Sequence, residues 1–420
     1  MLRRMRIRFL AASLLLVAAR AVSAETPTPI DAQDPAFARV SRERPPMRVW
    51  HTEVERAGAS WGKSLRREAQ RQLGYRGLVL PGGGRALMAF YEREAIDSLA
   101  PAVPGTAALF YRAVDAEGRR GARIAIGATA DVGLFLDRGK GEAAVIGVWR
   151  DGASPLLSIA ADGAITRTLS LKLPRRPLRM EMHGTGYLVW VDFRGDEKMD
   201  KGPFHLLRIG GEGRTVWSFE YPRGHYGFVA TAARADGFTL AVLNEGPLKG
   251  IVQDVAALLL DRAGRRVAKH TLALSGNGGP VPTGLHALRG GGFLLTGFWW
   301  GPGGNFVAWL DADGKLVRHA DVTLGDFVEV QWILPLGDRG FFGTNAKGEL
   351  LRFDRDTKLL WRWARPAAET GTDREIEIHD IRVLAGNQLL VAGSRSWFDD
   401  AGAEGRVAAR GYFVERFRWE

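Results

Sequence analysis

Apolar residues recur along the chain in a unit that repeats about every 43 to 52 residues. Each copy contains an apolar run, a tight turn of the D-x-x-G kind, and a second run in which apolar and polar residues alternate. Alternation with a period of two predicts β-strands, and the glycine provides the positive φ that a tight hairpin needs. The copies begin at Leu109, Leu156, Leu206, Leu258, Val307 and Leu350.

A second pair of strands around a glycine turn precedes each copy, as in Phe228–Leu243, Gly284–Phe298 and Glu377–Gly393. Each unit is therefore expected to be a four-stranded antiparallel meander, and its length is typical of a propeller blade. The sequence predicts an all-β fold, a seven-bladed β-propeller. The blades are expected near residues 75–126, 127–174, 175–222, 226–274, 279–324, 326–366 and 377–420.

The seventh unit lacks an outer strand, because its third strand, Ala408–Phe417, runs into the end of the chain. The missing strand is found near the other end. Arg48–Arg56 reads RVWHTEVER and matches the outer strands Arg214–Pro222 and Lys358–Pro366, each of which carries a tryptophan. An N-terminal strand that completes the last blade would remove both open edges of the ring. Residues 46–420 are thus predicted to form one domain.

The turn and outer strand at Phe353–Trp361, FDRDTKLLW, carry the clearest form of the repeat. This unit resembles the quinoprotein-like, or PQQ-type, propeller repeat, and the units also resemble those of exported bacterial propellers. The resemblance implies the fold rather than a reaction. Quinone-binding members of that family usually have eight blades and a vicinal cysteine pair, whereas this chain has no cysteine. We therefore expect no quinone cofactor.

The N-terminus has the three parts of a secretory signal peptide. Arg3, Arg4, Arg6 and Arg8 precede an apolar stretch of 11 residues, Phe9–Ala19, and small residues end at Ala24. That stretch is shorter than the roughly 20 residues that span a bilayer. Residues 1–24 are predicted to be removed on export, and residues 25–45 to form an extended linker. The protein is then expected to be soluble in the periplasm or outside the cell.

Composition narrows the possible functions. The 420 residues are 46% hydrophobic and 25% charged, which is typical of a globular protein, and the absence of cysteine excludes disulfides and thiolate chemistry. The net charge of +11 invites a nucleic-acid function, but the arginine pairs are scattered along the repeats, whereas nucleic-acid binding needs a clustered basic surface. The GxxxxGK[ST] pattern of a P-loop and the HExxH motif are absent. We expect neither nucleic-acid binding nor a membrane span.

The connections between strands differ on the two faces of the predicted ring. Turns between third and outer strands are minimal throughout, whereas several connections on the opposite face are long. Long loops on a rigid framework commonly hold binding residues, so we expect function on the loop-rich face. The long connections include Glu92–Gly105, Phe193–Pro203, Asn244–Gln253 and Ser396–Gly405.

Three sets of residues could carry chemistry. Aromatic and histidine side chains on the loop-rich face could bind a partner: His225, Trp299, Trp300, Trp397 and Phe398. Trp50, Trp217 and Trp361 recur on outer strands and are expected to pack between blades instead. Carboxylates in one loop are weak candidates for a divalent metal: Asp192, Asp196 and Asp200.

Histidines on the predicted inner strands form the third set. His183, His286 and His379 would line the central channel, and Glu377 and Asp380 flank His379. Neutral histidine can bind a metal or act as a general base.

Two functions follow. The first is a non-catalytic exported propeller that binds a protein, peptide or glycan through its loop-rich face. The alternative is a lyase or hydrolase that uses His286 or His379 with Glu377 or Asp380, with or without a divalent metal.

Overall fold

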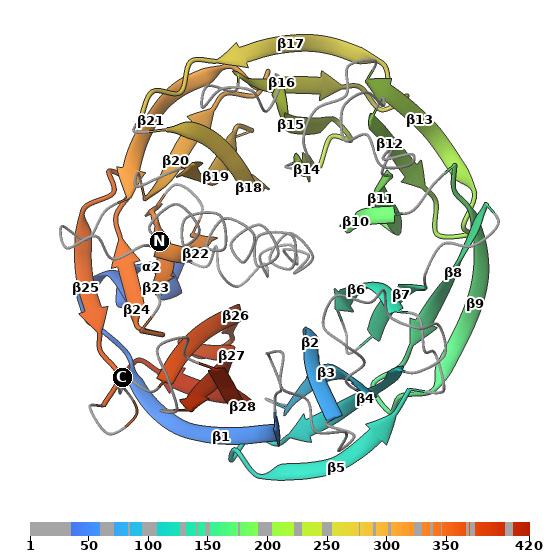
Figure 1. Ribbon diagram of the computed structural model, residues 1–420. Helices are drawn as coiled ribbons and strands as arrows, with labels where there is room; N and C mark the ends of the chain where they lie inside the picture. Colours follow the sequence, from blue (N-terminus) through green and yellow to red (C-terminus); the bar gives the residue numbers. More distant parts are fainter. Residues whose placement is uncertain are drawn as a thin grey trace, which may run out of the picture.

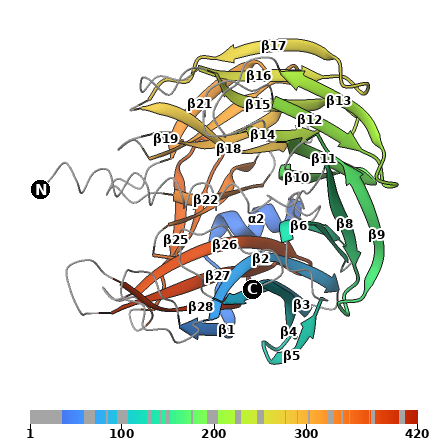
Figure 2. The ribbon, with the colours of Figure 1, turned by 45° about the vertical axis from the view of Figure 1, so that its right-hand side comes forward.

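The strands of the protein, described from a computed structural model, form a ring around a central opening (Figure 1). A turned view shows β17 (Arg266–Leu272) and β5 (Arg120–Ala125) on opposite sides of the ring (Figure 2). The signal peptide predicted at residues 1–24 lies outside the described residues. The structure describes residues 35–58, 71–82, 85–94, 107–126, 132–139, 142–147, 152–174, 177–191, 204–221, 229–245, 254–276, 278–288, 291–300, 304–322, 330–336, 339–345, 347–366, 369, 374–399 and 406–420.

Within these residues, seven four-stranded antiparallel sheets follow one another around the ring. The chain is a seven-bladed β-propeller, as the repeat predicts. Blades 1 and 2 contain β2 (Arg71–Gly82), β3 (Arg85–Glu94), β4 (Ala107–Val114), β5 (Arg120–Ala125), β6 (Val132–Gly139), β7 (Glu142–Gly147), β8 (Ala153–Ile159) and β9 (Ile165–Lys172). Blades 3 and 4 contain β10 (Pro177–His183), β11 (Gly186–Val191), β12 (Phe204–Ile209), β13 (Thr215–Tyr221), β14 (Val229–Ala233), β15 (Thr239–Glu245), β16 (Asp254–Leu260) and β17 (Arg266–Leu272). Blades 5 and 6 contain β18 (Gly279–Ala287), β19 (Phe293–Trp300), β20 (Asn305–Leu310), β21 (Leu316–Val322), β22 (Val330–Pro335), β23 (Phe341–Asn345), β24 (Leu350–Phe353) and β25 (Leu359–Trp363).

Blade 7 is built from both ends of the described chain. Its inner strands are β26 (Arg374–Leu384), β27 (Gln388–Asp399) and β28 (Arg406–Arg418), and β1 (Met47–Gly58) is its outer strand. β1 pairs antiparallel with β28, from Met47 opposite Arg418 to Gly58 opposite Ala409. The predicted closure of the ring by an N-terminal strand is therefore confirmed.

A short helix departs from the expected extended linker at residues 25–45. The helix α2 (Pro35–Glu43) lies beside blade 6 in Figure 1. Phe37 of the helix is buried in the core between blades 6 and 7. Trp361 of β25 donates a hydrogen bond from its indole Nε1 to the carbonyl oxygen of Ser41, at 2.6 Å. The linker prediction failed here because the proline and charged residues of α2 concealed the two apolar side chains, Phe37 and Val40, that pack on the ring.

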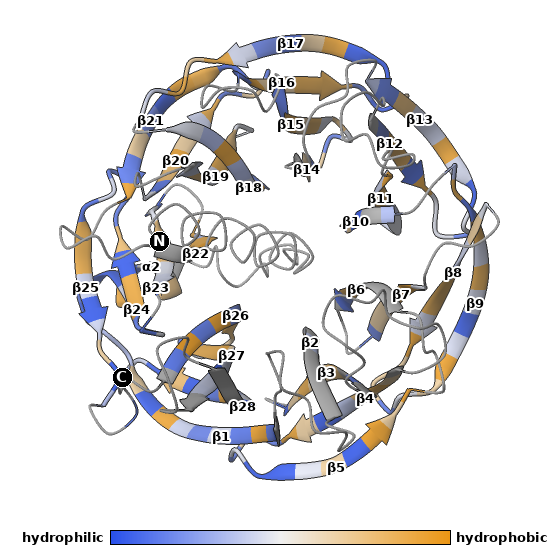
Figure 3. Ribbon diagram, in the orientation of Figure 1, coloured by the Kyte–Doolittle hydropathy of each residue, from blue (hydrophilic) through white to orange (hydrophobic). Residues whose placement is uncertain are grey.

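The core of the propeller is divided among its blade interfaces. In the described residues, seven clusters of buried apolar side chains each join two neighbouring blades. Middle strands bury both of their faces, and β16 accordingly is largely hydrophobic in Figure 3. Outer strands such as β1 lie on the rim and are mostly hydrophilic in the same view. This is the pattern expected when sheets pack face to face around a ring.

Tight turns join the third and outer strands of blades 1 to 6. A residue with positive φ ends each turn, and five of the six are glycine: Gly118, Gly163, Gly213, Gly264 and Gly314. Thr357 takes this position in blade 6, with φ 67°. A β-branched residue is strained in that region of φ, so the D-x-x-T form of the turn is the less stable one.

The outer-strand tryptophans pack against the next blade, as expected. If Gly118 of blade 1 carried a Cβ atom, that atom would lie only 2.6 Å from Cδ2 of Trp50. A Cβ atom on Gly264 of blade 4 would lie equally close to Cδ2 of Trp217. The indole of Trp50 also donates to the Ala116 carbonyl at 3.0 Å. Glycine in these turns therefore leaves room for an indole ring as well as permitting the backbone conformation.

Candidate functional site

The first strand of each blade lies nearest the central opening, and the three histidines of interest lie on such strands (Figure 1). His183 is on β10, His286 on β18 and His379 on β26. The structure does not bring them together. None of the three belongs to the cluster of potential metal ligands found among the described residues, so they form no common metal centre there.

His379 packs against the neighbouring blade. Its ring stacks on the ring of Tyr75 of β2, with centroids 5.0 Å apart and planes 18° from parallel. The His379 Nε2 atom lies 2.8 Å from the Ser394 hydroxyl oxygen. The Tyr75 hydroxyl lies 3.4 Å from Oδ2 of Asp380. Tyr75 therefore contacts both His379 and Asp380.

Asp380 belongs to a buried ionic network, centred on Arg382, that contacts blades 7, 1 and 2. Arg382 donates to both Asp380 carboxylate oxygens at 3.0 Å, and its Nη1 lies 3.4 Å from Asp137 of blade 2. It also donates to the Leu78 carbonyl of blade 1 at 3.2 Å. Burial raises the pKa of Asp380, although the Arg382 guanidinium opposes the effect. Burial and the Asp380 carboxylate raise the pKa of Tyr75 well above its ordinary value.

This arrangement is better suited to holding blades together than to catalysis. A serine and a histidine at 2.8 Å have the spacing of a nucleophile and its base. Ser394, however, is only 1% exposed, so a substrate does not reach its hydroxyl. Asp380 is occupied by Arg382. Glu377 lies two register pairs before Asp380 on β26, opposite Ser394.

His286 lies in a second polar cluster, which joins blades 3, 4 and 5. Arg179 and Glu181 of β10 form an ion pair, with Nε and Oε1 at 2.7 Å. The Thr231 hydroxyl of β14 donates to Glu181 at 2.5 Å, and Arg179 donates to the Thr283 carbonyl of β18 at 3.4 Å. Burial lowers the pKa of His286 to about 4, an effect increased by Arg179 and opposed by Glu181. His286 is therefore neutral near pH 7 and a weak base.

The lowered pKa of His286 predicts a loss of stability in mild acid. Between about pH 6.5 and 4, the unfolded chain binds a proton at His286 that the folded chain does not bind. The free energy of unfolding should therefore decrease as the pH falls through this range, by at most about 3 kcal/mol. Urea denaturation at several pH values measures this change.

His286→Gln should remove that part of the pH dependence. His270→Gln, on the rim strand β17, is the matched control and should keep the wild-type profile. An unchanged profile in His286→Gln would show that His286 binds protons equally in both states.

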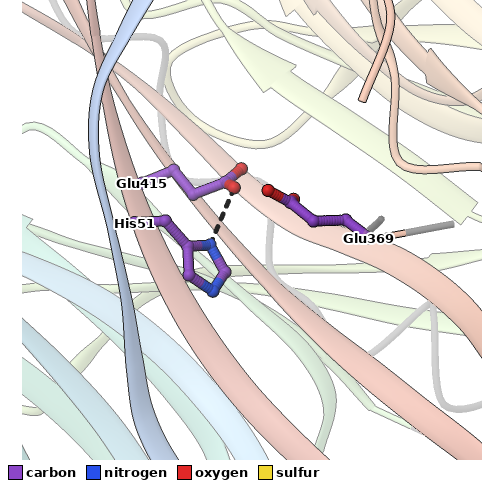
Figure 4. Close-up of side chains that lie close together, drawn as sticks. All are labelled: His51, Glu369 and Glu415. Atoms are coloured by element: carbon purple, nitrogen blue, oxygen red, sulfur yellow. Dashed lines mark hydrogen bonds and ion pairs between the residues drawn. The ribbon is translucent and has the colours of Figure 1, made fainter. Parts of the chain in front are cut away.

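The closing blade contains a third cluster, which the sequence analysis missed (Figure 4). Glu415 of β28 is fully buried, and its carboxylate accepts hydrogen bonds from Arg365 at 2.8 and 2.6 Å. Arg48 donates to it at 3.0 Å, and His51 Nδ1 lies at 2.9 Å. Glu369 accepts a hydrogen bond from Arg48 at 2.8 Å. A charged residue within the apolar run YFVERF was the available signal, since buried charges require partners.

The pKa of Glu415 reflects these contacts. Burial opposes its ionisation, but the Arg365 guanidinium and the hydrogen bond with His51 prevail, and together they lower its pKa to about 2. His51, Glu369 and Glu415 each offer a ligand atom, and these atoms lie within 4.8 Å of one another. Two guanidinium groups already occupy the Glu415 oxygens, so the cluster fits an ion network better than a metal site.

The aromatic candidates separate into buried and accessible groups. Trp299 was expected on the binding face, but it is 2% exposed, packs on Phe306 and donates to Asp321 at 2.7 Å. Its place at a strand end suggested exposure, yet its ring turns into the core between blades 4 and 5. Trp397 is half-buried near the end of β27.

The other sequence-predicted positions lie outside what the structure describes. His225, Asp192, Asp196 and Asp200 are outside the described residues, as is most of the loop-rich face. For Trp300 and Phe398 the backbone is described but the side chain is not. No helix in the described part of the chain is long and apolar enough to cross a bilayer.

Comparison with known proteins supports the fold. No protein-family model and no curated protein matches the chain. The structure of Chaetomium thermophilum Raptor matches with a TM-score of 0.51 and 10% identity, over 90% of this chain and 30% of Raptor. The WD40 propeller domain of Doa1 matches with a TM-score of 0.47 and 10% identity, over 89% and 98% of the two chains. The propeller domain of the Trilobed protease from Pyrococcus furiosus gives 0.47 and 11%, over 79% and 97%. What they share with this chain is the propeller fold.

Proposed function

We propose that the protein is an exported, non-catalytic propeller that binds a protein, peptide or glycan through its loop-rich face. Export rests on the signal-peptide pattern of residues 1–24, which places the mature chain in the periplasm or outside the cell. The D-x-x-T turn of blade 6, followed by Trp361, supports a PQQ-type repeat. We expect no quinone, because the chain has no cysteine.

One observation carries the binding function. Asp380 and Glu181, two acids on the inner strands, are engaged in contacts between blades. Asp380 pairs with Arg382 of its own strand and lies 3.4 Å from the Tyr75 hydroxyl of blade 1. Glu181 pairs with Arg179 of its own strand and accepts a hydrogen bond from Thr231 of blade 4. His379 is stacked on Tyr75. Groups used in this way make the ring rigid, and a rigid ring presents loops in a fixed arrangement, which reduces the entropy cost of binding.

Selection of ligands by the purified mature chain tests this function. The probes are a displayed library of random dodecapeptides and a glycan array. We expect ligands that bind the wild type and compete with one another for one face. His379→Gln and His286→Gln should bind them with unchanged affinity, because neither residue belongs to the proposed face.

Two results would contradict the proposal. Failure to enrich any peptide or glycan above a control propeller would remove the binding function. Loss of binding in the His379→Gln variant, with unchanged folding by circular dichroism, would place the site in the channel and favour the enzymatic alternative.

A further inference from the structure

Trp397 forms a fixed aromatic platform near the loop-bearing end of blade 7. A Cβ on Gly411 of β28 would lie 3.0 Å from Cη2 of the indole, so the ring rests directly on that strand. The guanidinium carbon of Arg56 lies 4.0 Å from the centroid of the same ring. Arg56 is near the end of β1 and is exposed, whereas Trp397 is half-buried. The two side chains therefore form a stacked pair at the surface.

Arg56 has hydrogen-bond donors to spare. Within the described part of the chain, no carboxylate forms an ion pair with it. The adjacent Glu55 is held by Arg112 of blade 1, with Oε2 and Nη2 at 2.7 Å. Stacking on an indole fixes the plane of a guanidinium while its N–H groups at the edge remain available. A guanidinium held in this way can bind a carboxylate through two parallel hydrogen bonds.

Among the described residues, a further positive charge lies close to the pair. The guanidinium carbon of Arg395 is 5.9 Å from the Trp397 centroid. Arg395 belongs to the closing network, in which Arg48, Arg365 and Arg395 outnumber the two carboxylates. An anion bound at Arg56 would therefore approach a region of favourable potential.

We propose that Arg56 and Trp397 anchor an acidic segment of a partner protein, with a carboxylate on Arg56 and apolar atoms against the indole edge. The proposal rests on the proposed binding function and names the class of its partner. An acidic peptide fits better than a nucleic acid, because one stacked arginine holds one carboxylate whereas a phosphate backbone requires a row of cations. Arginine and tryptophan are also the residues that dominate binding energy at protein interfaces.

The peptides selected from the random dodecapeptide library test this proposal. We expect them to be rich in Asp and Glu. A selected peptide should bind about tenfold more weakly to Arg56→Gln than to the wild type, and its affinity should fall as salt increases. Arg56→Lys keeps the charge but not the planar fork, so it should restore only part of the affinity. Arg266→Gln on β17 removes the same charge elsewhere on the rim and should leave binding unchanged.

The outcomes separate this proposal from the function on which it rests. Peptides of neutral composition, or equal binding to Arg56→Gln and Arg266→Gln, would overturn the acidic anchor and leave the binding function intact. Tighter binding of a single-stranded oligonucleotide than of any peptide, with the same dependence on Arg56, would also overturn it. No enriched peptide would overturn the acidic anchor, and no enriched peptide together with no bound glycan would contradict both. Circular dichroism of each variant checks that weaker binding reflects the anchor and not unfolding.

Discussion

Glu415→Leu should lower the free energy of unfolding by about 3 to 5 kcal/mol, because it removes the carboxylate that makes the shorter hydrogen bonds with a buried guanidinium. Arg365, whose side chain is 1% exposed, would lose both Glu415 oxygens and keep only Glu369, at 3.2 Å. The effect is measured as the shift of the urea denaturation curve of the purified chain at pH 7.

Two further variants are compared with Glu415→Leu: one removes both partners of the buried pair, and the other breaks an exposed pair. Replacing both Glu415 and Arg365 by leucine should recover part of the loss, because no unpaired charge of that pair stays buried. Asp261→Asn breaks a pair whose arginine, Arg265, is 80% exposed, and should cost less than about 1 kcal/mol. A loss below 1 kcal/mol in Glu415→Leu would show that the network contributes little to stability.

Acid should weaken the same network. The folded-state pKa of Glu415 is lowered from 4.5 to about 2, so its contribution to stability is complete above about pH 4.5. That contribution should be lost as the pH falls toward about 2, where the folded protein also takes up the proton. Glu415→Leu should lack this part of the acid transition.

Cross-linking the two strands that close the ring should raise the free energy of unfolding by a similar amount. Thr52 of β1 lies directly opposite Val414 of β28. A disulfide between cysteines at these positions would close a loop of about 360 residues and should stabilise the protein by about 4 to 5 kcal/mol. Because the chain has no cysteine of its own, no other bridge can form. Denaturation with and without a reducing agent measures the difference.

A pair displaced by one residue tests the register. Cysteines at Thr52 and Phe413 would point to opposite faces of the sheet and should cross-link poorly. Efficient oxidation of the displaced pair, with none at Thr52 and Val414, would show that β1 pairs in another register.

The architecture could be predicted because its signals are local and repeated. Alternating apolar positions mark strands, and a glycine such as Gly264 marks the turn between two of them. Because the same pattern recurs in each unit, an ambiguous strand or turn in one unit can be assigned from its equivalents in the others. The closing strand was recognised by its similarity to other outer strands, with Trp50 in the place of Trp217, and the pairing of β1 with β28 confirms it.

The side-chain clusters could not be predicted because they depend on contacts between distant residues. Glu415 and Arg365 are 50 positions apart, and Arg48 joins them from the other end of the chain. The orientation of a single ring is equally undetermined: Trp299 and Trp397 both stand near strand ends, but only Trp299 turns into the core. The helix α2 was missed since only the assembled ring offers Phe37 an apolar surface.

The pairing of β1 with β28 also sets an order for biosynthesis. While the ribosome is still making blade 7, β1 has no partner, because residues 406–418 are the last strand to appear. The earlier blades can assemble in sequence before then, but the ring stays open until residues 406–418 are available to pair with β1. Unpaired strand edges are sites of aggregation, so the interval before this pairing is when a chaperone would be of most use.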